Sequence, residues 1–188
     1  MSLIRIHEDG ITRCSWVTDD QIYIDYHDKE WGTGGRGQRE LFEAICLEGF
    51  QAGLSWITIL KRREGFRHAF ENFEIEKVAN FQDADVSRLM QDSGIIRNQA
   101  KIRSAINNAK IILEKELDLE ELLWSFAPAV SQSQAKDFQW RATSPESDAM
   151  SKALKKLGFS FVGSTTMYAL MQSSGMVKDH APGCFRRD

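Results

Sequence analysis

Apolar residues recur along the chain at the spacing of amphipathic helices. In residues 39–50 they occupy positions i, i+1, i+4 and i+5, so one face of a helix would be apolar and the other polar. Residues 102–113 and 149–157 repeat this spacing, and lysines occupy the opposite face of the second of these segments. Residues 164–174 are apolar on nearly every side, which predicts a buried helix. Four helices follow from periodicity alone.

Local signals agree with these helices and give little support for strands. Typical start and stop residues flank the last two helices, namely Ser144, Pro145, Gly158 and Gly175. Alternation of apolar and polar residues is confined to one short run at 21–26. Residues 32–37 are a glycine-rich loop without the spacing of a phosphate-binding loop, and residues 127–145 are aperiodic and indicate a long connection. The sequence therefore predicts an all-α chain.

Composition places the chain among soluble globular proteins. Its 188 residues are 42% hydrophobic and 27% charged, which suits a single unit with its own core. No apolar run approaches the roughly 20 residues that cross a bilayer, and no signal-peptide pattern opens the sequence. The net charge of -3 argues against nonspecific coating of nucleic acid but permits contacts with a few phosphates. Three widely spaced cysteines indicate a reducing compartment, so we expect a cytoplasmic monomer.

Two cysteines and two histidines near the chain ends have spacings that suit a metal ion. Cys14 and His27 frame twelve residues, and His180 and Cys184 form an H-x3-C pair. Two thiolates and two imidazoles make a closed tetrahedral set that zinc favours, and a closed set is structural rather than catalytic. The alternative is that the cysteines are small core residues and the histidines lie on the surface. The two remaining histidines are interpreted as surface residues, namely His7 and His68.

An acidic residue lies beside the apolar stripe of the first predicted helix. Glu48 follows Leu41 by seven positions and Ile45 by three, which places it at the edge of that stripe, whereas Glu43 points away. A carboxylate that faces an interior must be hydrogen-bonded, paired or functional. The alternative is that Glu48 turns outward at the helix end. The glycine-flanked turn that follows leads to Trp56, and it could form one wall of a pocket or simply pack in the core.

Aromatic residues crowd the N-terminal part of the chain. Trp16, Tyr23, Tyr26 and Trp31 fall within sixteen residues. Such a cluster usually belongs to a core, but aromatic faces also stack on planar ligands and attract cations. Aromatic faces beside the carboxylate of Glu48 would suit a purine that carries a positive charge.

Several long motifs, in order along the chain, resemble those of one bacterial family. They are CSW at 14–16, YIDYHDKEWG at 23–32, LFEAICLEGFQAGLSW at 41–56, DSGIIRN at 92–98 with Lys101 and Ile102, FSFVGSTT at 159–166 and GMVKDH at 175–180. Together they span residues 13 to 184, nearly the whole chain. The sequence thereby resembles the bacterial 3-methyladenine-DNA glycosylase I (Tag) family.

The resemblance implies an all-α helix–hairpin–helix glycosylase fold with a zinc-binding lobe formed by both termini. That lobe would comprise about 13–37 and 160–188, and a helical body of about 38–159 would carry a DNA-binding hairpin at 92–102. The family's single structural zinc ion would be held by Cys14, His27, His180 and Cys184. Its base pocket would consist of the carboxylate of Glu48 and the aromatic walls Trp16, Tyr26 and Trp56, with Tyr23 nearby.

The implied activity is hydrolysis of the N-glycosidic bond of 3-methyladenine in alkylated double-stranded DNA, after the nucleotide has been flipped out of the helix. No lysine stands out as an amine nucleophile, so we expect no strand cleavage. DNA contacts are expected from Gly94, Arg97 and Lys101 of the hairpin and from Gln51 and Leu54, with Leu54 filling the gap left by the base. The alternatives are a zinc-stapled DNA-binding module without catalytic activity and a zinc hydrolase, which the closed ligand set disfavours.

Overall fold

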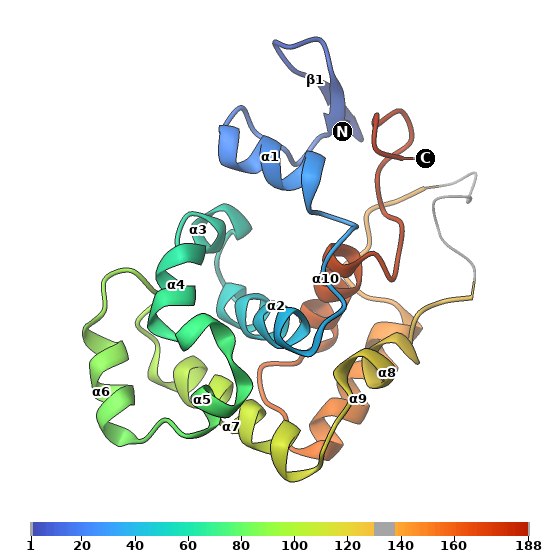
Figure 1. Cartoon of the computed structure of the whole chain (residues 1–188). Coiled ribbons are helices and arrows are strands. Elements are labelled where there is room, and N and C mark those ends of the chain that lie inside the picture. Colours follow the sequence, from blue (N-terminus) through green and yellow to red (C-terminus); the bar gives the residue numbers. More distant parts are fainter. Residues whose placement is uncertain (1, 130–137, 188) are drawn as a thin grey trace.

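The computed structural model describes residues 2–129 and 138–187, and this part of the chain is mostly helical (Figure 1). Its α-helices are α1 (Gln21–Lys29), α2 (Gln38–Gln51), α3 (Trp56–Leu60), α4 (Arg63–Ala69), α5 (Ile75–Ala79), α6 (Asp83–Gln91), α7 (Gln99–Glu114), α8 (Leu119–Trp124), α9 (Pro145–Leu157) and α10 (Ser164–Ser174). A single 3-10 turn, η1 (Glu71–Phe73), and the strands β1 (Ile4–Ile6) and β2 (Thr12–Cys14) complete the described elements. None of the described helices combines the length and apolar character needed to cross a membrane.

The four helices predicted from periodicity are confirmed as α2, α7, α9 and α10. Their ends follow local chemistry: the Ser144 side chain accepts a hydrogen bond from the backbone N–H of Ser147 at the start of α9. Gly158 and Gly175 end α9 and α10 in the left-handed region, with φ of 106° and 80°. The start of α9 and the ends of α9 and α10 are thus set by serine and glycine, residue types that are unfavourable inside a helix.

Helix α2 lies in the middle of the helical body, next to α10 (Figure 1). Nine of its fourteen residues are buried, because it also packs against α3, α7, α8 and η1. Leu41, Phe42 and Ile45 are almost fully buried and belong to the main apolar core. A helix enclosed in this way can hold a polar side chain in the interior, and α2 carries two acidic ones there.

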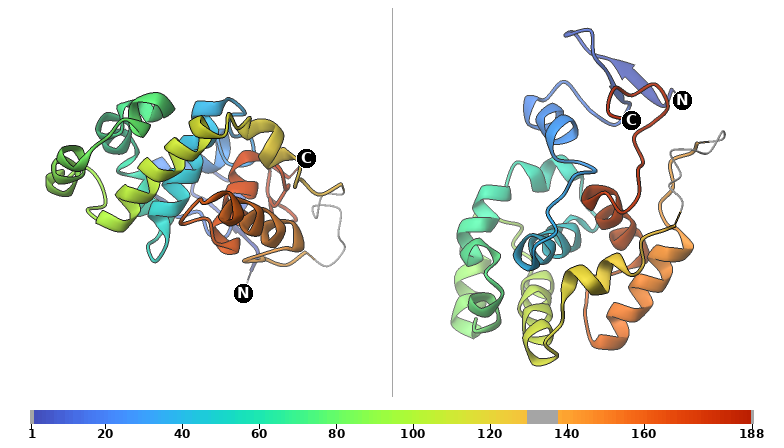
Figure 2. Two further views of the ribbon diagram at one scale, coloured as in Figure 1. Left: turned by 90° about the horizontal axis from the view of Figure 1, so that it is seen from below. Right: turned by 45° about the vertical axis from the view of Figure 1, so that its right-hand side comes forward.

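A second apolar cluster joins the two ends of the chain. It lies in what we call the terminal lobe, which consists of β1, β2, α1 and the segment after α10 (Figure 2). The backbone N–H of Phe185 donates to the carbonyl of Thr12 at 3.0 Å, and that of Ser15 to the carbonyl of Leu3 at 3.0 Å. Trp56 packs against both this cluster and the main core. The junction between lobe and body is therefore lined by aromatic residues.

The all-α prediction is wrong at the N-terminus. β1 and β2 form a small antiparallel hairpin in which Ile4 pairs with Cys14 and Ile6 with Thr12. Each strand has only three residues, too few to produce a readable alternation. The run at 21–26, which does alternate, lies instead in α1, whose first turn is capped by the side chain of Asp20.

His7 is not a surface residue as predicted, whereas His68 is exposed. The His7 side chain is 3% exposed, and its Nδ1 lies 3.2 Å from Oδ1 of Asp19. The hairpin folds back on the segment before α1 and covers the imidazole. That contact joins residues twelve positions apart in the sequence, so the local pattern around His7 could not reveal it.

Candidate active site and metal centre

A cavity of about 260 Å³ lies where the terminal lobe meets the helical body. Its described lining consists of Trp16, Tyr23, Tyr26, Trp31, Glu48, Gln51, Trp56, Trp140, Arg141, Ala169 and Gln172. The structure thus brings together the carboxylate and all four aromatic residues that the sequence assigned to a base pocket, with Gln51 beside them. They come from α1, α2, α3 and the segment before α1, and packing at the junction of lobe and body holds them around one space.

Glu48 is an unpaired carboxyl group in this cavity. Only 4% of the residue is exposed, so the side chain does not turn out to solvent at the helix end. Its Oε1 lies 3.4 Å from the hydroxyl of Ser173, which donates to it, while Oε2 has no hydrogen-bond partner among the described residues. Burial raises the pKa of Glu48 to about 8. The group is therefore protonated at neutral pH and has an oxygen free for a ligand.

Glu43 does not point away from the core as predicted, for it is 5% exposed. Its two oxygens accept hydrogen bonds from Arg39 Nη1 at 2.9 Å and from Arg67 Nε at 2.7 Å. Two arginines thus compensate the buried charge, as a buried carboxylate requires. Of the two buried carboxyl groups on this helix, Glu43 therefore has cationic partners and Glu48 has none.

The aromatic rings form a connected wall around the cavity. The rings of Trp16 and Tyr23 lie 5.1 Å apart between centroids, and those of Tyr26 and Trp56 lie 5.4 Å apart. Trp31 meets Trp16 edge-on at 5.0 Å. The indole N–H of Trp56 is buried without a partner in the described part of the chain. Flat apolar faces, a free N–H donor and a protonated carboxyl group are what a purine ring needs from a site.

Four lining residues escaped the sequence analysis, namely Trp140, Arg141, Ala169 and Gln172. Trp140 and Arg141 lie in the aperiodic stretch that was interpreted as a connection. Ala169 and Gln172 lie on α10, where the pattern predicted burial but not a cavity. No periodic or motif signal marks these four positions, so sequence reasoning had no means of finding them.

The four predicted metal ligands meet in the terminal lobe. All are buried, and one ligand atom from each lies within 4.8 Å of the others, namely from Cys14, His27, His180 and Cys184. Cys184 Sγ lies 3.4 Å from His27 Nε2 and 3.6 Å from His180 Nδ1, while Cys14 Sγ lies 3.9 Å from His180 Nδ1. Atoms bound to one tetrahedral ion at 2.0–2.3 Å lie roughly 3.3–3.8 Å apart. The arrangement is close to this geometry and could hold a metal ion.

The remaining imidazole nitrogens already have partners. His27 Nδ1 lies 2.8 Å from Oδ1 of Asp28, and His180 Nε2 lies 3.3 Å from the carbonyl of Trp31. Such contacts fix the tautomer of a ligating histidine and orient its ring. They leave Nε2 of His27 and Nδ1 of His180 facing the two sulfur atoms, as a metal site requires.

A buried arginine supports this outer layer. Arg13 is 2% exposed and donates to Asp28 from Nε at 2.9 Å and from Nη2 at 2.7 Å. It also donates to both oxygens of Asp9, at 3.0 and 2.8 Å. Burial alone would raise the pKa of Asp28. The hydrogen bonds from Arg13 and His27 outweigh burial, so the pKa lies below its usual value. The carboxylate that orients His27 is thus kept charged and in place.

The segment 92–98, which falls in the predicted hairpin, joins α6 to α7 through a short turn. The backbone N–H of Gly94 donates to Oδ1 of Asp92 at 2.7 Å, and Asn98 Oδ1 accepts from the backbone N–H of Lys101 at 3.1 Å. A Cβ atom on Gly65 would meet the carbonyl of Gly94 at 2.5 Å, so α4 touches this turn. Arg97 is exposed beside the start of α7. Leu54, in the turn after α2, is 41% exposed.

Lys101, which was expected to contact DNA, is largely buried. It is 8% exposed, and its Nζ donates to the carbonyls of Phe50 at 2.9 Å and Ala52 at 2.6 Å. These carbonyls lie at the end of α2, where backbone acceptors have no partner within the helix. The lysine stem is long enough to reach from α7 to α2, and the ammonium group satisfies them. Lys101 therefore fastens the two helices together.

Replacement of Lys101 by Met is expected to lower the free energy of unfolding by about 2–3 kcal/mol, because Met keeps the apolar stem but removes the donor to the buried carbonyl of Phe50 and to the part-buried carbonyl of Ala52. Chemical denaturation of both proteins measures the change. Lys110 on the same helix is exposed, so Lys110→Met should change stability by no more than about 0.5 kcal/mol. Equal effects of the two substitutions would contradict the role given to Lys101.

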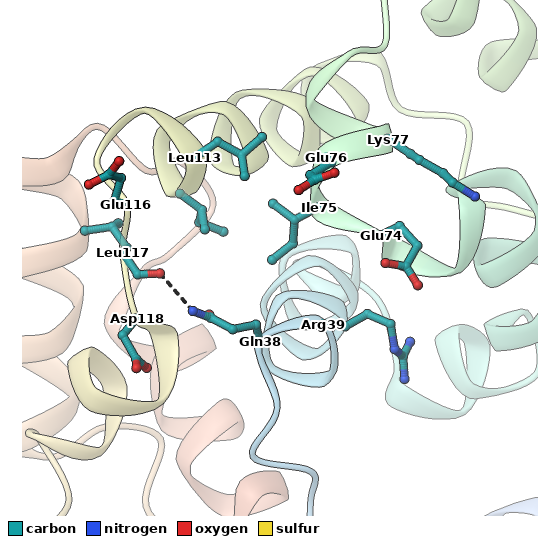
Figure 3. A pocket seen from close by; sticks show the side chains of 11 residues that line it. Gln38, Arg39, Glu74, Ile75, Glu76, Lys77, Leu113, Glu116, Leu117 and Asp118 are labelled. Atoms are coloured by element: carbon teal, nitrogen blue, oxygen red, sulfur yellow. Dashed lines mark hydrogen bonds between the residues drawn. The ribbon is translucent and has the colours of Figure 1, made fainter.

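A larger hollow of about 540 Å³ lies on another part of the body (Figure 3). It is bounded by the start of α2, by α5 and by the end of α7, and Gln38 donates to the carbonyl of Leu117 at 3.0 Å across it. Four acidic residues line it, namely Glu74, Glu76, Glu116 and Asp118, with Arg39 and Lys77 as the described cations. This lining contains no aromatic ring, and its acids repel phosphate. The smaller aromatic cavity is therefore the better candidate for a base.

Comparison with known proteins shows which family the chain resembles. The sequence model of the methyladenine glycosylase family matches residues 16–187. DNA-3-methyladenine glycosylase 1 of Escherichia coli (strain K12) is 51% identical over 178 residues, which cover 92% of this chain and 95% of that protein. A crystal structure of 3-methyladenine DNA glycosylase I superposes with a TM-score of 0.88 at 47% identity, over 94% of this chain and 100% of that one.

A variant of 3-methyladenine DNA glycosylase I in complex with 3-methyladenine also superposes, with a TM-score of 0.83 at 31% identity. This match covers 94% of the present chain and 97% of that one. The likeness thus extends over the helical body, the aromatic cavity and most of the terminal lobe. The chain belongs to the methyladenine glycosylase family.

Proposed function

We propose that this protein hydrolyses the N-glycosidic bond of 3-methyladenine in alkylated double-stranded DNA. The observation that carries the proposal is the carboxyl group of Glu48, buried in an aromatic cavity with one oxygen unpaired. A buried polar group without a partner is costly, and its cost is repaid when a ligand supplies the missing hydrogen bond. The names of the relatives, all 3-methyladenine glycosylases, point to the same ligand.

The protonation state of Glu48 suits the edge of an adenine ring. With a pKa of about 8, the neutral carboxyl group has one O–H donor and one acceptor oxygen. It can accept from the exocyclic amine and donate to the ring nitrogen beside it. Rings such as Tyr26 and Trp56 can stack on the faces of the base or bind its edge, and cation–π attraction favours a base that N3-methylation has made cationic. Glu48 thus recognises the base and does not attack the sugar.

Bond cleavage needs little further help from the protein. When the bond from the base nitrogen to C1′ of the deoxyribose breaks, its electron pair neutralises the positive charge of the base. Water then adds to C1′ and releases a proton. No lysine lines the described part of the cavity, so no amine is placed to form an imine with the sugar. We therefore propose a monofunctional reaction without strand cleavage, and trapping of a covalent imine with borohydride would contradict it.

We propose that the four-ligand centre holds one zinc ion with a structural role. Two thiolates and two imidazoles are a donor set that zinc prefers, and four protein ligands leave no open position for water. The outer contacts of His27 and His180 support this identity, since both rings already have the tautomers that ligation needs. The ion, when bound, would connect the N-terminal and C-terminal segments of the terminal lobe. It would thereby hold Trp16, Tyr23 and Tyr26 at the cavity.

We propose that the hairpin at 92–98 and the turn after α2 bind the DNA. Backbone N–H groups near Gly94 and the side chain of Arg97 can hold phosphates, which makes this a helix–hairpin–helix contact. Gln51 lines the cavity at the end of α2, next to the turn. Leu54 is exposed at that turn and can enter the base stack where the flipped nucleotide was.

The Leu54→Ala variant is expected to release base from duplex DNA about tenfold more slowly, because the gap in the stack is no longer filled. Its binding of free 3-methyladenine should be unchanged. Leu113→Ala is a matched control, since Leu113 is also 41% exposed but lies in the larger hollow. Kinetics on duplex DNA and calorimetry with the free base measure the two effects. If both leucine variants behave alike, Leu54 does not act as a wedge.

The proposed function is tested by release of free bases from methylated duplex DNA, resolved by chromatography, for the parent protein and for Glu48→Gln. The expected result is release of 3-methyladenine by the parent, with 7-methylguanine retained in the DNA, and slower release by the variant. DNA binding without release of any base, in a folded protein that contains zinc, would instead identify a zinc-stapled binding module without catalytic activity.

A further inference from the structure

The rim of the aromatic cavity carries two residues that have no part in the family resemblance, Trp140 and Arg141. We propose that Arg141 binds a DNA phosphate next to the flipped nucleotide, while Trp140 adds a further stacking face to the base site. The inference rests on the proposed function and extends it to the strand around the damaged base. It assigns a binding role to a segment that the sequence marks only as a connection.

The segment is anchored beside the cavity by Phe138. Phe138 is 8% exposed and belongs to the apolar cluster of the terminal lobe. The ring of Trp140 lies 5.1 Å from that of Phe138 between centroids and meets it nearly perpendicularly, at 83°. Edge-to-face pairs of this kind are favourable. The contact therefore holds Trp140 at the cavity, where the residue is still 36% exposed.

Arg141 is a free cation at this rim. It is exposed and forms no ion pair with any described residue, although it lines the cavity. Among the described lining residues it is the one cation, and Glu48 is the one acid. A base that carries a positive charge is repelled by a guanidinium group, so Arg141 does not favour the base itself. When the flipped base enters the cavity, the phosphates of its nucleotide stay outside, close to the mouth. A guanidinium group at that position can bind one of them, because guanidinium binds phosphate well.

Trp140 has a different task from Arg141. A tryptophan that lines an aromatic cavity and is one-third exposed offers a face to a planar ring, and bases bind to proteins largely by stacking on such faces. The same face attracts a cationic ring more than a neutral one. Trp140 should therefore matter for the free base, whereas Arg141 should matter only when the base is attached to DNA.

The test of Arg141 compares Arg141→Gln with Lys152→Gln, which removes one charge from an exposed position on α9 away from the cavity. We expect Arg141→Gln to raise KM for methylated duplex DNA about five- to tenfold with little change in kcat. The slope of log KM against log salt should fall by about one, as for the loss of one phosphate contact. Binding of free 3-methyladenine should not change. KM and salt slopes equal to those of Lys152→Gln would overturn the assignment of Arg141.

The test of Trp140 compares Trp140→Ala with Trp140→Phe by calorimetry with free 3-methyladenine. The alanine variant should bind the base at least about fivefold more weakly, and the phenylalanine variant should retain most of the affinity because a stacking face remains. Unchanged binding by Trp140→Ala would refute the stacking role. A parent protein that releases no base would instead refute the proposed function, so the two failures are distinguishable.

Discussion

The Glu48→Gln variant is expected to release 3-methyladenine about a hundredfold more slowly than the parent protein, yet to be the more stable of the two near pH 8. The loss of activity follows because the amide of Gln, although it also has a donor and an acceptor, cannot lose a proton and so cannot place a negative charge beside a cationic base, as the carboxyl group can. Removal of one well-placed group of this kind typically costs about 10²–10³ in rate. Single-turnover kinetics on methylated duplex DNA measure this effect.

The gain in stability follows from the pKa of Glu48, which burial raises from 4.5 to about 8. Between these pH values the folded protein keeps a proton that the unfolded chain has lost, so the free energy of unfolding falls as pH rises. The slope is about 1.4 kcal/mol per pH unit, which amounts to several kcal/mol by pH 8. Gln does not titrate and escapes this loss. The advantage of the variant should be absent below pH 4.5 and grow from there to pH 8.

Glu43→Gln is the matched control for Glu48→Gln. Glu43 is equally buried on the same helix, but it is paired with Arg39 and Arg67. Its replacement leaves two guanidinium groups with a weaker partner, so that variant should lose stability, by about 3 kcal/mol. Urea denaturation from pH 5 to 8 distinguishes the two. A Glu48→Gln variant whose stability follows the parent at every pH would show that the Glu48 carboxyl group is not strained by burial.

Removal of the metal is expected to have the largest effect on structure. The four ligands come from both ends of the chain and meet inside the terminal lobe. Metal binding of this kind is coupled directly to folding, with apparent free energies of about 10–16 kcal/mol for small zinc domains. We expect treatment with a strong chelator, or the Cys184→Ser substitution, to unfold the lobe. Base release should then cease, because Trp16, Tyr23 and Tyr26 are no longer held at the cavity.

Thermal unfolding, metal analysis and near-ultraviolet circular dichroism together test this expectation. The melting temperature should fall by about 10 °C or more, and zinc should restore the chelated parent but not Cys184→Ser. Cys46→Ala provides a control, because Cys46 is a buried thiol of α2 outside the metal centre. That variant should keep its zinc content. A chelated protein with an intact lobe and full activity would be incompatible with a structural metal.

Long periodic segments and chemically distinctive residues could be predicted from the sequence. The stripe of α2 revealed the helix and placed Glu48 at the edge of its apolar face, and the structure decides between the inward and the outward position in favour of the inward one. The four-ligand cluster could be predicted because few residue types bind metal ions such as zinc. Its two pairs of ligands are nevertheless far apart in the sequence. Residues that depend on distant partners could not be predicted: Glu43 relies on Arg67 from another helix. In the same way, a lysine near a helix start is normally solvated, so the reach of Lys101 to the end of α2 was not foreseeable.

The four-ligand centre, once it holds its ion, would also determine when the protein can first act. His27 and Cys184 are separated by 157 positions in the sequence, yet they lie side by side in the lobe. During synthesis on the ribosome the first half of the ligand set therefore emerges long before the second. The core of the helical body is complete only slightly earlier, because it includes α10 and Val177. We expect the aromatic cavity to be completed only after Cys184 has left the exit tunnel, so a chain that stops short of Cys184 would have a folded body but no finished site.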